Sequence, residues 1–353
     1  MKNKMLLGLL FASTIALGQS QNSVGKDYNK GHSLSTNGQI IEAYNAPARI
    51  NPVGKWDVDL SASFIYWQAR EHGLEMGVSI TADPSNDDGH IINMNFDYHP
   101  GFKVGLGTNF PSHDNWTIFG EYTRLYLSDK VSSDAPAGGS ITPTWWYQSG
   151  VTRSASRGAS HWKLDLNILD IEIARPYYVG TKLTFSPLFG GRATFIDQKL
   201  NSNYYITSES ATVYSRNKSK AWSLGPRLGL DTNWFLSKNF KIVGNTAFAL
   251  MYQHFTAKCK LDDATTGTGS LHKHTQNSTG LLFPSFELTP GISWGSYCYN
   301  NKLHFDILLA YEFHYLWNQN QPSHNFDVST FAVDGVTGDL MLHGATLTLK
   351  FDF

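Results

Sequence analysis

The last eight residues of the chain alternate strictly between polar and apolar side chains. This period of two is typical of a β-strand with one apolar face. The apolar face carries Leu347, Leu349, Phe351 and Phe353. A chain that ends on such a strand with a terminal aromatic residue resembles the substrates of the bacterial barrel assembly machinery. We therefore predict an outer-membrane β-barrel with these four residues as its assembly signal.

The other end of the chain is typical of an exported protein. Lys2 and Lys4 precede an apolar stretch over residues 5–17, which predicts a signal peptide over residues 1–18. The following segment, residues 19–55, is polar, rich in Gly, Asn and Ser, and without a clear period. We predict a periplasmic arm there, and a small plug of the barrel stays open as the alternative.

The composition agrees with a barrel that faces lipid. Aromatic residues make up 14% of the chain and charged residues only 16%, while the mean hydropathy is -0.29. The mean hydropathy of a β-barrel is low even though its outer face is apolar, because a polar lumen residue follows each lipid-facing one along a strand. After the signal peptide, no apolar run approaches the roughly 20 residues of a transmembrane helix, so a spanning chain must close its backbone hydrogen bonds in a barrel. The net charge of -1 implies no nucleic acid partner.

Period-two segments recur from Trp56 to the end, so the barrel is predicted over residues 56–353. Ten strands fit, and from the second onward their connectors alternate between short and long, as in outer-membrane barrels. The predicted strands are 56–81, 90–108, 115–128, 160–174, 180–197, 220–235, 240–256, 280–297, 302–318 and 340–353. The long loops would be 129–159, 198–219, 257–279 and 319–339. The fold class is an all-β, transmembrane, antiparallel up-and-down barrel.

Two features keep a count of twelve strands open. The first predicted strand is interrupted at residues 71–73, and residues 204–215 could hold a further hairpin. The alternation also changes phase at Leu169, which predicts a β-bulge. Cys259 and Cys298 would lie at opposite ends of the barrel, so we expect no disulfide between them within one chain, while a link between chains stays open.

Several segments resemble the major-outer-membrane-protein-like (MOMP-like) family of Legionella and chlamydia-related bacteria. The segments are Tyr44–Ala48, Ser63–Ala69, Asn93–Tyr98, Pro100–Gly105, Asn115–Trp116 and Glu121–Thr123. The resemblance covers the chain from about Tyr44 to Phe353. It implies a surface-exposed outer-membrane porin and carries over no catalytic residue. Chlamydial members are often rich in cysteine and cross-linked, whereas this chain has two cysteines.

Charged residues on the polar faces of the predicted strands are the candidate pore lining, because such groups set ion selectivity in a water-filled pore. The candidates are Asp97, Lys103, Glu121, Lys163, Asp165, Lys182, Arg192, Arg227, Asp231, Glu287, Asp306, Glu312 and Lys350. Acidic residues outnumber basic ones on these faces, which favours a weak cation preference at most. In a narrow barrel the same groups would instead pair across the interior and fill it.

Other candidate sites are weaker. His304, Asp306, Glu312 and His314 share one strand face, but no serine motif accompanies them as acid–base catalysis by a hydrolase would require. His272 and His274 lack a nearby third metal ligand. The loop aromatic cluster Trp145, Trp146 and Tyr147 could bind a partner or a sugar, or fold into the barrel mouth and narrow it.

We therefore expect a passive pore for small hydrophilic solutes and ions. A closed structural or adhesive barrel that binds partners through its outer loops is the alternative. Neither implies an enzyme or a cofactor. The expected partners are outer-membrane lipids and the barrel assembly machinery, with a homo-oligomer and host surface ligands left open.

Overall fold

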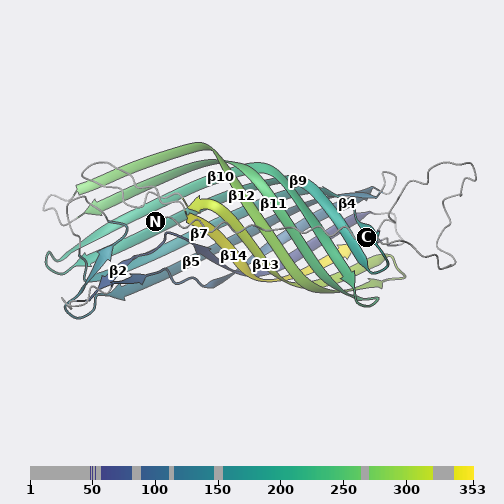
Figure 1. Ribbon diagram of the computed structural model, residues 1–353, viewed down its shortest axis with the longest axis horizontal. Coiled ribbons are helices and arrows are strands. Elements are labelled where there is room, and N and C mark those ends of the chain that lie inside the picture. Colours follow the sequence, from purple (N-terminus) through teal and green to yellow (C-terminus); the bar gives the residue numbers. More distant parts are fainter. Residues whose placement is uncertain are drawn as a thin grey trace, which may run out of the picture. The chain divides into compact units, whose positions relative to one another are not determined.

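Ten long antiparallel strands form the chain into a barrel (Figure 1). The computed structural model describes residues 48, 50, 52, 57–81, 89–110, 115–146, 154–263, 270–320 and 338–353. The predicted signal peptide and most of the predicted arm lie outside them. The barrel strands are β1 (Val58–Glu71), β4 (Tyr98–Phe110), β5 (Trp116–Asp134), β7 (Arg157–Ala174), β9 (Leu183–Ile206), β10 (Ala211–Phe235), β11 (Phe240–Asp263), β12 (Ser270–Cys298), β13 (Leu303–Asn320) and β14 (Gly338–Asp352).

The ring closes because each barrel strand pairs antiparallel with the next one along the chain, and the last pairs with the first. The β14–β1 seam runs from the pair Asp59↔Asp352 to the pair Glu71↔Leu340. The predicted fold class and the count of ten barrel strands are therefore confirmed, and the count of twelve is wrong. No helix among the described residues is long and apolar enough to cross a membrane.

Four short strands lie outside the ring. β8 (Tyr177–Val179) pairs only with the start of β9, and β2 (Gly77–Ile80), β3 (Gly89–Ile92) and β6 (Ser140–Pro143) form a separate sheet. The predicted first strand is thus too long. It ends at Glu71 in a turn where Gly73 adopts a φ of 83°, a left-handed conformation that favours glycine.

The two ends of the barrel differ. One end, here the turn end, has the connectors that follow β4, β7, β10 and β12, and the other is the loop end. In outer-membrane barrels the turn end faces the periplasm. The predicted loop 198–219 is wrong, because β9 and β10 continue as a hairpin with a four-residue turn over 207–210. Likewise β11 and β12 occupy most of 257–279.

These strands extend beyond the membrane, as β9 illustrates. Along this strand the apolar side chains change from the outward face to the inward face. Up to Phe195 the exposed outward side chains are apolar; beyond it they include Lys199, Asn201 and Asn203. The inward face changes the opposite way, from Arg192 and Thr194 to buried aliphatic and aromatic residues. A belt of exposed aromatic residues, Tyr66, Phe195, Trp222 and Tyr252, divides the barrel wall. We call the wall from this belt to the turn end the lipid-facing band, and the wall beyond the belt the outer extension. In water the outer extension needs an apolar core, as any soluble barrel does.

The two cysteines lie at opposite ends, as predicted. Cys259 is on β11 in the outer extension and Cys298 ends β12 at the turn end, and both are free. The predicted bulge at Leu169 is wrong, because β7 pairs with β5 and β9 without a break in register.

Candidate functional site: the barrel lumen

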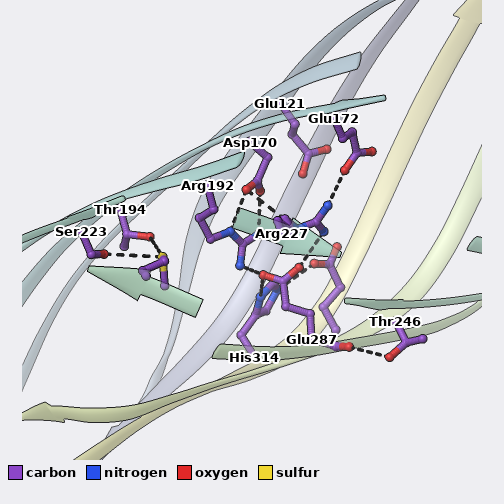
Figure 2. A network of polar contacts seen from close by, with 12 residues as sticks. Glu121, Asp170, Glu172, Arg192, Thr194, Ser223, Arg227, Thr246, Glu287 and His314 are labelled. Atoms are coloured by element: carbon purple, nitrogen blue, oxygen red, sulfur yellow. Dashed lines mark hydrogen bonds and ion pairs between the residues drawn. The ribbon is translucent and has the colours of Figure 1, made fainter. Parts of the chain in front are cut away.

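Buried charges cross the lumen inside the lipid-facing band, and Figure 2 shows their centre. On neighbouring strands, the Arg192 guanidinium donates two hydrogen bonds to Asp170, from Nε at 2.7 Å and from Nη2 at 2.6 Å. This two-pronged geometry holds both planar groups in one orientation. Both side chains are almost fully buried.

Glu287 on β12 joins the two arginines. It forms an ion pair with Arg192 and accepts a hydrogen bond from Arg227 Nη2 at 2.9 Å. Arg227 also contacts Glu172 on β7, and His314 Nδ1 lies 3.1 Å from Glu287 Oε1 (Figure 2). One carboxylate therefore connects β9, β10, β12 and β13 through the middle of the barrel.

The network continues to the opposite wall. His314 Nε2 lies 3.0 Å from Glu312 Oε2, and Lys103 on β4 donates a hydrogen bond to the same Glu312 oxygen at 2.6 Å. Lys103 Nζ also lies 3.4 Å from Glu121 on β5. Ion pairs and the hydrogen bonds of His314 thus form one connected network, which crosses the lumen from β7 to β13 and returns through β4 to β5. Breaking buried pairs of this kind leaves uncompensated charge, so each member depends on the others.

A polar cavity of about 390 Å³ occupies the lumen around and below this network, toward the turn end. Nine carboxylates and five Lys or Arg side chains line it. At its lower end Asp306 pairs with Lys241, and Asp352 lies 2.8 Å from His304 Nδ1 and 3.1 Å from Lys350 Nζ.

An apolar plug fills the lumen on the loop side of the charges. Its largest members are Trp67, Trp162, Phe255 and Phe283, each at most 1% exposed. The Trp67 ring lies 4.7 Å from the His314 ring and 5.1 Å from Lys103 Nζ, so plug and charge network are in direct contact. These side chains belong to one hydrophobic cluster, to which buried residues of most of the barrel strands contribute.

The loop that carries β6 covers the plug. Trp145 and Trp146 are 5% and 2% exposed and belong to the same core, and Trp145 Nε1 donates a hydrogen bond to Glu75 O at 2.9 Å. Tyr204 fastens the small sheet to β9, because its hydroxyl donates to Met76 O at 2.7 Å. Of the two expectations for the loop aromatics, the one in which they fold into the barrel mouth fits these two residues. Tyr147 lies outside the described residues.

The structure places most of the predicted lining residues inside the barrel. These are Lys103, Glu121, Arg192, Arg227, Asp231, Glu287, Asp306, Glu312 and Lys350. The lumen position is wrong for four others. Lys163 and Asp165 point outward, because the apolar face of β7 that holds Trp162 forms the plug. Asp97 is exposed between β3 and β4, and Lys182 is exposed in the turn before β9.

Three central residues were not among the predicted lining. Asp170 and Glu172 follow Leu169, where the alternation changes phase, and neither is among the predicted candidates. Without a bulge, Leu169, Ile171 and Ile173 are the lipid-facing residues of β7 and the two carboxylates point inward. Lys241 is also absent from the predicted lining, although Phe240 and Ile242 on either side of it point outward and the alternation would have assigned it to the lumen.

Every residue of the strand face suggested for acid–base chemistry has a hydrogen-bond or ion-pair partner. His304, Asp306, Glu312 and His314 are all buried in the lumen, and each contacts an oppositely charged or hydrogen-bonding neighbour. Among the described residues, no group of three or more His, Cys, Asp or Glu side chains could hold a metal ion.

The residues predicted as an assembly signal lie on the outer face of β14. Leu347, Leu349 and Phe353 are 43%, 38% and 42% exposed, and Phe351 is partly covered by Phe305 at 5.0 Å between ring centroids. They flank the seam with β1, the last pairing that closes the ring.

One family model and several solved structures are similar to this chain. A family model described as Legionella pneumophila major outer membrane protein precursor matches residues 51–353. No curated protein matches the chain. Among solved structures, the outer membrane protease OmpT from Escherichia coli aligns with a TM-score of 0.47 and 11% identity, over 87% of this chain and 99% of OmpT. The Pseudomonas putida toluene transporter TodX aligns with a TM-score of 0.32 and 9% identity, over 86% of this chain and 91% of TodX. Ail of Yersinia pestis aligns with a TM-score of 0.21 and 9% identity, over 83% of this chain and 99% of Ail. These similarities concern the fold alone.

Proposed function

The chain belongs to the family of the Legionella pneumophila major outer membrane protein precursor, and on this premise we propose that it is a surface-exposed barrel that is closed at rest and acts through its outer extension. Its location is the bacterial outer membrane, as the family and the barrel establish. The proposal assigns no catalytic step and no cofactor to the lumen.

One observation carries the proposal, namely the apolar plug. Trp67, Trp162 and Phe255 come from β1, β7 and β11, three strands that are spread around the ring, and all three are 0% exposed inside it. Hydrated ions and sugars would have to leave water to pass such a constriction, and transfer of a charge into an apolar environment is strongly unfavourable. Below the plug, the charge network adds a second layer that would have to open.

Single-channel recording in a planar bilayer under a salt gradient tests the proposal. We expect no steady conductance steps from the refolded wild-type protein. Trp67→Ala combined with Phe255→Ala should produce steps, because the two substitutions remove rings that fill the lumen. Phe64→Ala combined with Tyr252→Ala is the matched control, since both side chains point outward at 55% and 44% exposure. Steady steps from the wild type would overturn the closed barrel.

A passive pore is the second candidate, and the polar cavity favours it. The cavity already provides about 390 Å³ of space lined by an excess of carboxylates. If the plug moves aside, such a lining would favour cations over anions. Wild-type conductance with a cation-selective reversal potential, made less selective by Asp231→Asn, would support this candidate against the first.

The partners of the barrel follow from its surfaces. We propose that the barrel assembly machinery recognises the outer face of β14 at the seam, and that outer-membrane lipids surround the lipid-facing band. A homo-oligomer and binding of host surface ligands through the outer extension are further proposals, which size measurement in detergent and cell-binding assays would test.

A further inference from the structure

The water-facing side of the outer extension carries a row of four lysines, here the lower basic row. Lys163, Lys199, Lys218 and Lys258 are direct cross-strand neighbours on β7, β9, β10 and β11. Opposite residues on one sheet face have Cβ atoms about 5 Å apart, so the row is roughly 15 Å long. Within the described part of the chain these four side chains form no ion pair with an acidic residue.

A second row lies two residues further along each strand, and we call it the upper basic row. It is composed of Lys130, Arg216, Lys260 and Lys273, with His161 and Asn201 between the first two. Like charges directly opposite one another destabilise a sheet. Eight cations on one face of a chain with a net charge of -1 therefore call for an anion from outside the chain.

The acidic residues on the turn side of the lower basic row are already engaged, whereas Asp262 lies beyond the upper basic row on its loop side. On the turn side of the lower basic row, Asp197 lies 2.8 Å from Lys220 and Asp165 lies 3.3 Å from Arg124. These pairs leave the lower basic row without a compensating carboxylate on its membrane side. The charge pattern thus changes from balanced to cationic within two residues along each strand.

The height of the lower basic row matches the headgroup layer of a membrane. Lys199 is four residues beyond Phe195, which marks the upper edge of the lipid-facing band on β9. Four residues of strand extend about 13 Å, and a tilt of about 40° reduces this to roughly 10 Å along the membrane normal. The polar headgroup zone of a bilayer is about 5–8 Å deep beyond the hydrocarbon edge, and a flexible lysine side chain at the level of the row can reach down into it.

A groove of about 360 Å³ connects this row to the lipid-facing band. Its lower part is lined by Phe195 and Trp222 and its upper part by Lys218 and Lys258, and between them lies the ion pair of Lys220 with Asp197. The His254 ring stacks on Trp222 at 5.9 Å and forms part of the same wall. A groove that is apolar toward the membrane and cationic above it fits a molecule with an acyl chain and a phosphorylated headgroup.

We propose that the lower basic row and this groove bind a phosphorylated glycolipid of the outer leaflet, with the phosphates on the lysines and an acyl chain against Trp222. Two features of the site support this ligand, namely the positive charge of the lysines and the height of the lower basic row above the lipid-facing band. It rests on the outer-membrane location and not on the closed lumen, so it stands or falls separately from the proposed function.

Binding of diphosphorylated lipid A to the refolded full chain in zwitterionic micelles tests the proposal. We expect saturable binding. The double variant Lys199→Gln/Lys218→Gln should bind about tenfold or more weakly, because each lysine near a phosphate raises the affinity roughly fivefold. Lys238→Gln/Lys302→Gln is the matched control, since both lysines are exposed at the turn end. Trp222→Ala should weaken binding, and Trp234→Ala at the other end of β10 should not.

The ligand arms separate the sources of phosphate. Dephosphorylated lipid A should bind at least tenfold more weakly, and inorganic phosphate should not displace the lipid. Equal binding to the lysine variant, or to the dephosphorylated lipid, would overturn the proposal. So would a soluble sulfated polysaccharide that binds this row while lipid A does not. If the first variant does not fold, Lys163→Gln/Lys258→Gln at the ends of the row provides the same test.

Discussion

Arg192 on β9 and Glu287 on β12 form an ion pair across the lumen, between strands that are three positions apart in the ring. Both side chains are also bound by other members of the network, Arg192 by Asp170 and Glu287 by Arg227 and His314. This pair therefore connects two walls that share no backbone hydrogen bond.

Glu287→Gln should destabilise the barrel by about 3 kcal/mol, because two buried guanidinium groups lose their shared carboxylate. Asp165→Asn is the control, since its pair with Arg124 faces outward and is more than a third exposed, so we expect a change below about 1 kcal/mol. Urea unfolding in detergent micelles, followed by loss of the heat-modifiable band, measures both. Equal losses of unfolding free energy in the two variants would show that the lumen ion pair stabilises the barrel no more than the exposed pair does.

Gly344→Ala should impair closure of the ring at the β14–β1 seam. A Cβ at this position would lie 2.2 Å from Tyr66 O and 2.8 Å from Trp67 Cα, both backbone atoms that a side-chain rotation cannot move. We expect a loss of about 1–3 kcal/mol and a smaller folded fraction on unheated gels. Gly191→Ala is the control, since its added Cβ would approach nothing closer than 3.8 Å. Normal folding of Gly344→Ala would contradict the close approach at the seam.

Stability should fall as the pH rises from about 5 to about 9 because of Glu71. This residue lies in the core of the outer extension, where burial outweighs its contact with Gln198 and raises the pKa of its carboxyl from the usual 4.5 to about 8. Between these two values the folded state holds a proton that the unfolded state releases, so a rising pH favours unfolding. The expected loss is on the order of 5 kcal/mol.

Glu71→Gln should remove this part of the pH dependence and be more stable than the wild type at high pH. The measurement is the midpoint of heat-induced unfolding across the pH range for both proteins. Parallel curves for the two proteins would mean that Glu71 does not bind the proton.

The two thiols should react with maleimide at different rates in the folded protein. Cys298 is exposed at the turn end, whereas Cys259 faces inward on β11 and burial raises the pKa of its thiol to about 11. A thiolate is the reacting species, so Cys259 should react about a hundredfold more slowly than an ordinary thiol at neutral pH. The single variants Cys298→Ser and Cys259→Ser isolate each rate. Fast labelling of Cys259 would instead favour the outer loop over 257–279 that the alternation predicts.

The sequence alone determines much of the barrel. Strict alternation at the end of the chain identifies β14 and the outward position of Leu347 and Leu349. The same pattern on β13 assigns His304, Asp306, Glu312 and His314 to the lumen, where the structure has them. These predictions succeed because each of those strands lies within the lipid-facing band, where the apolar face is always the outer one.

Only the tertiary structure decides which face is inside when a strand leaves the membrane. Alternation shows that two faces of β7 differ but not which of them meets the lumen, so Trp162 was assigned to lipid and Lys163 to a pore. In the outer extension water replaces lipid outside the barrel, and the apolar face turns inward to exclude it. The same ring closure brings Arg192 and Glu287 together and aligns Lys163, Lys199, Lys218 and Lys258. Such contacts depend on the register between strands, which no single strand encodes.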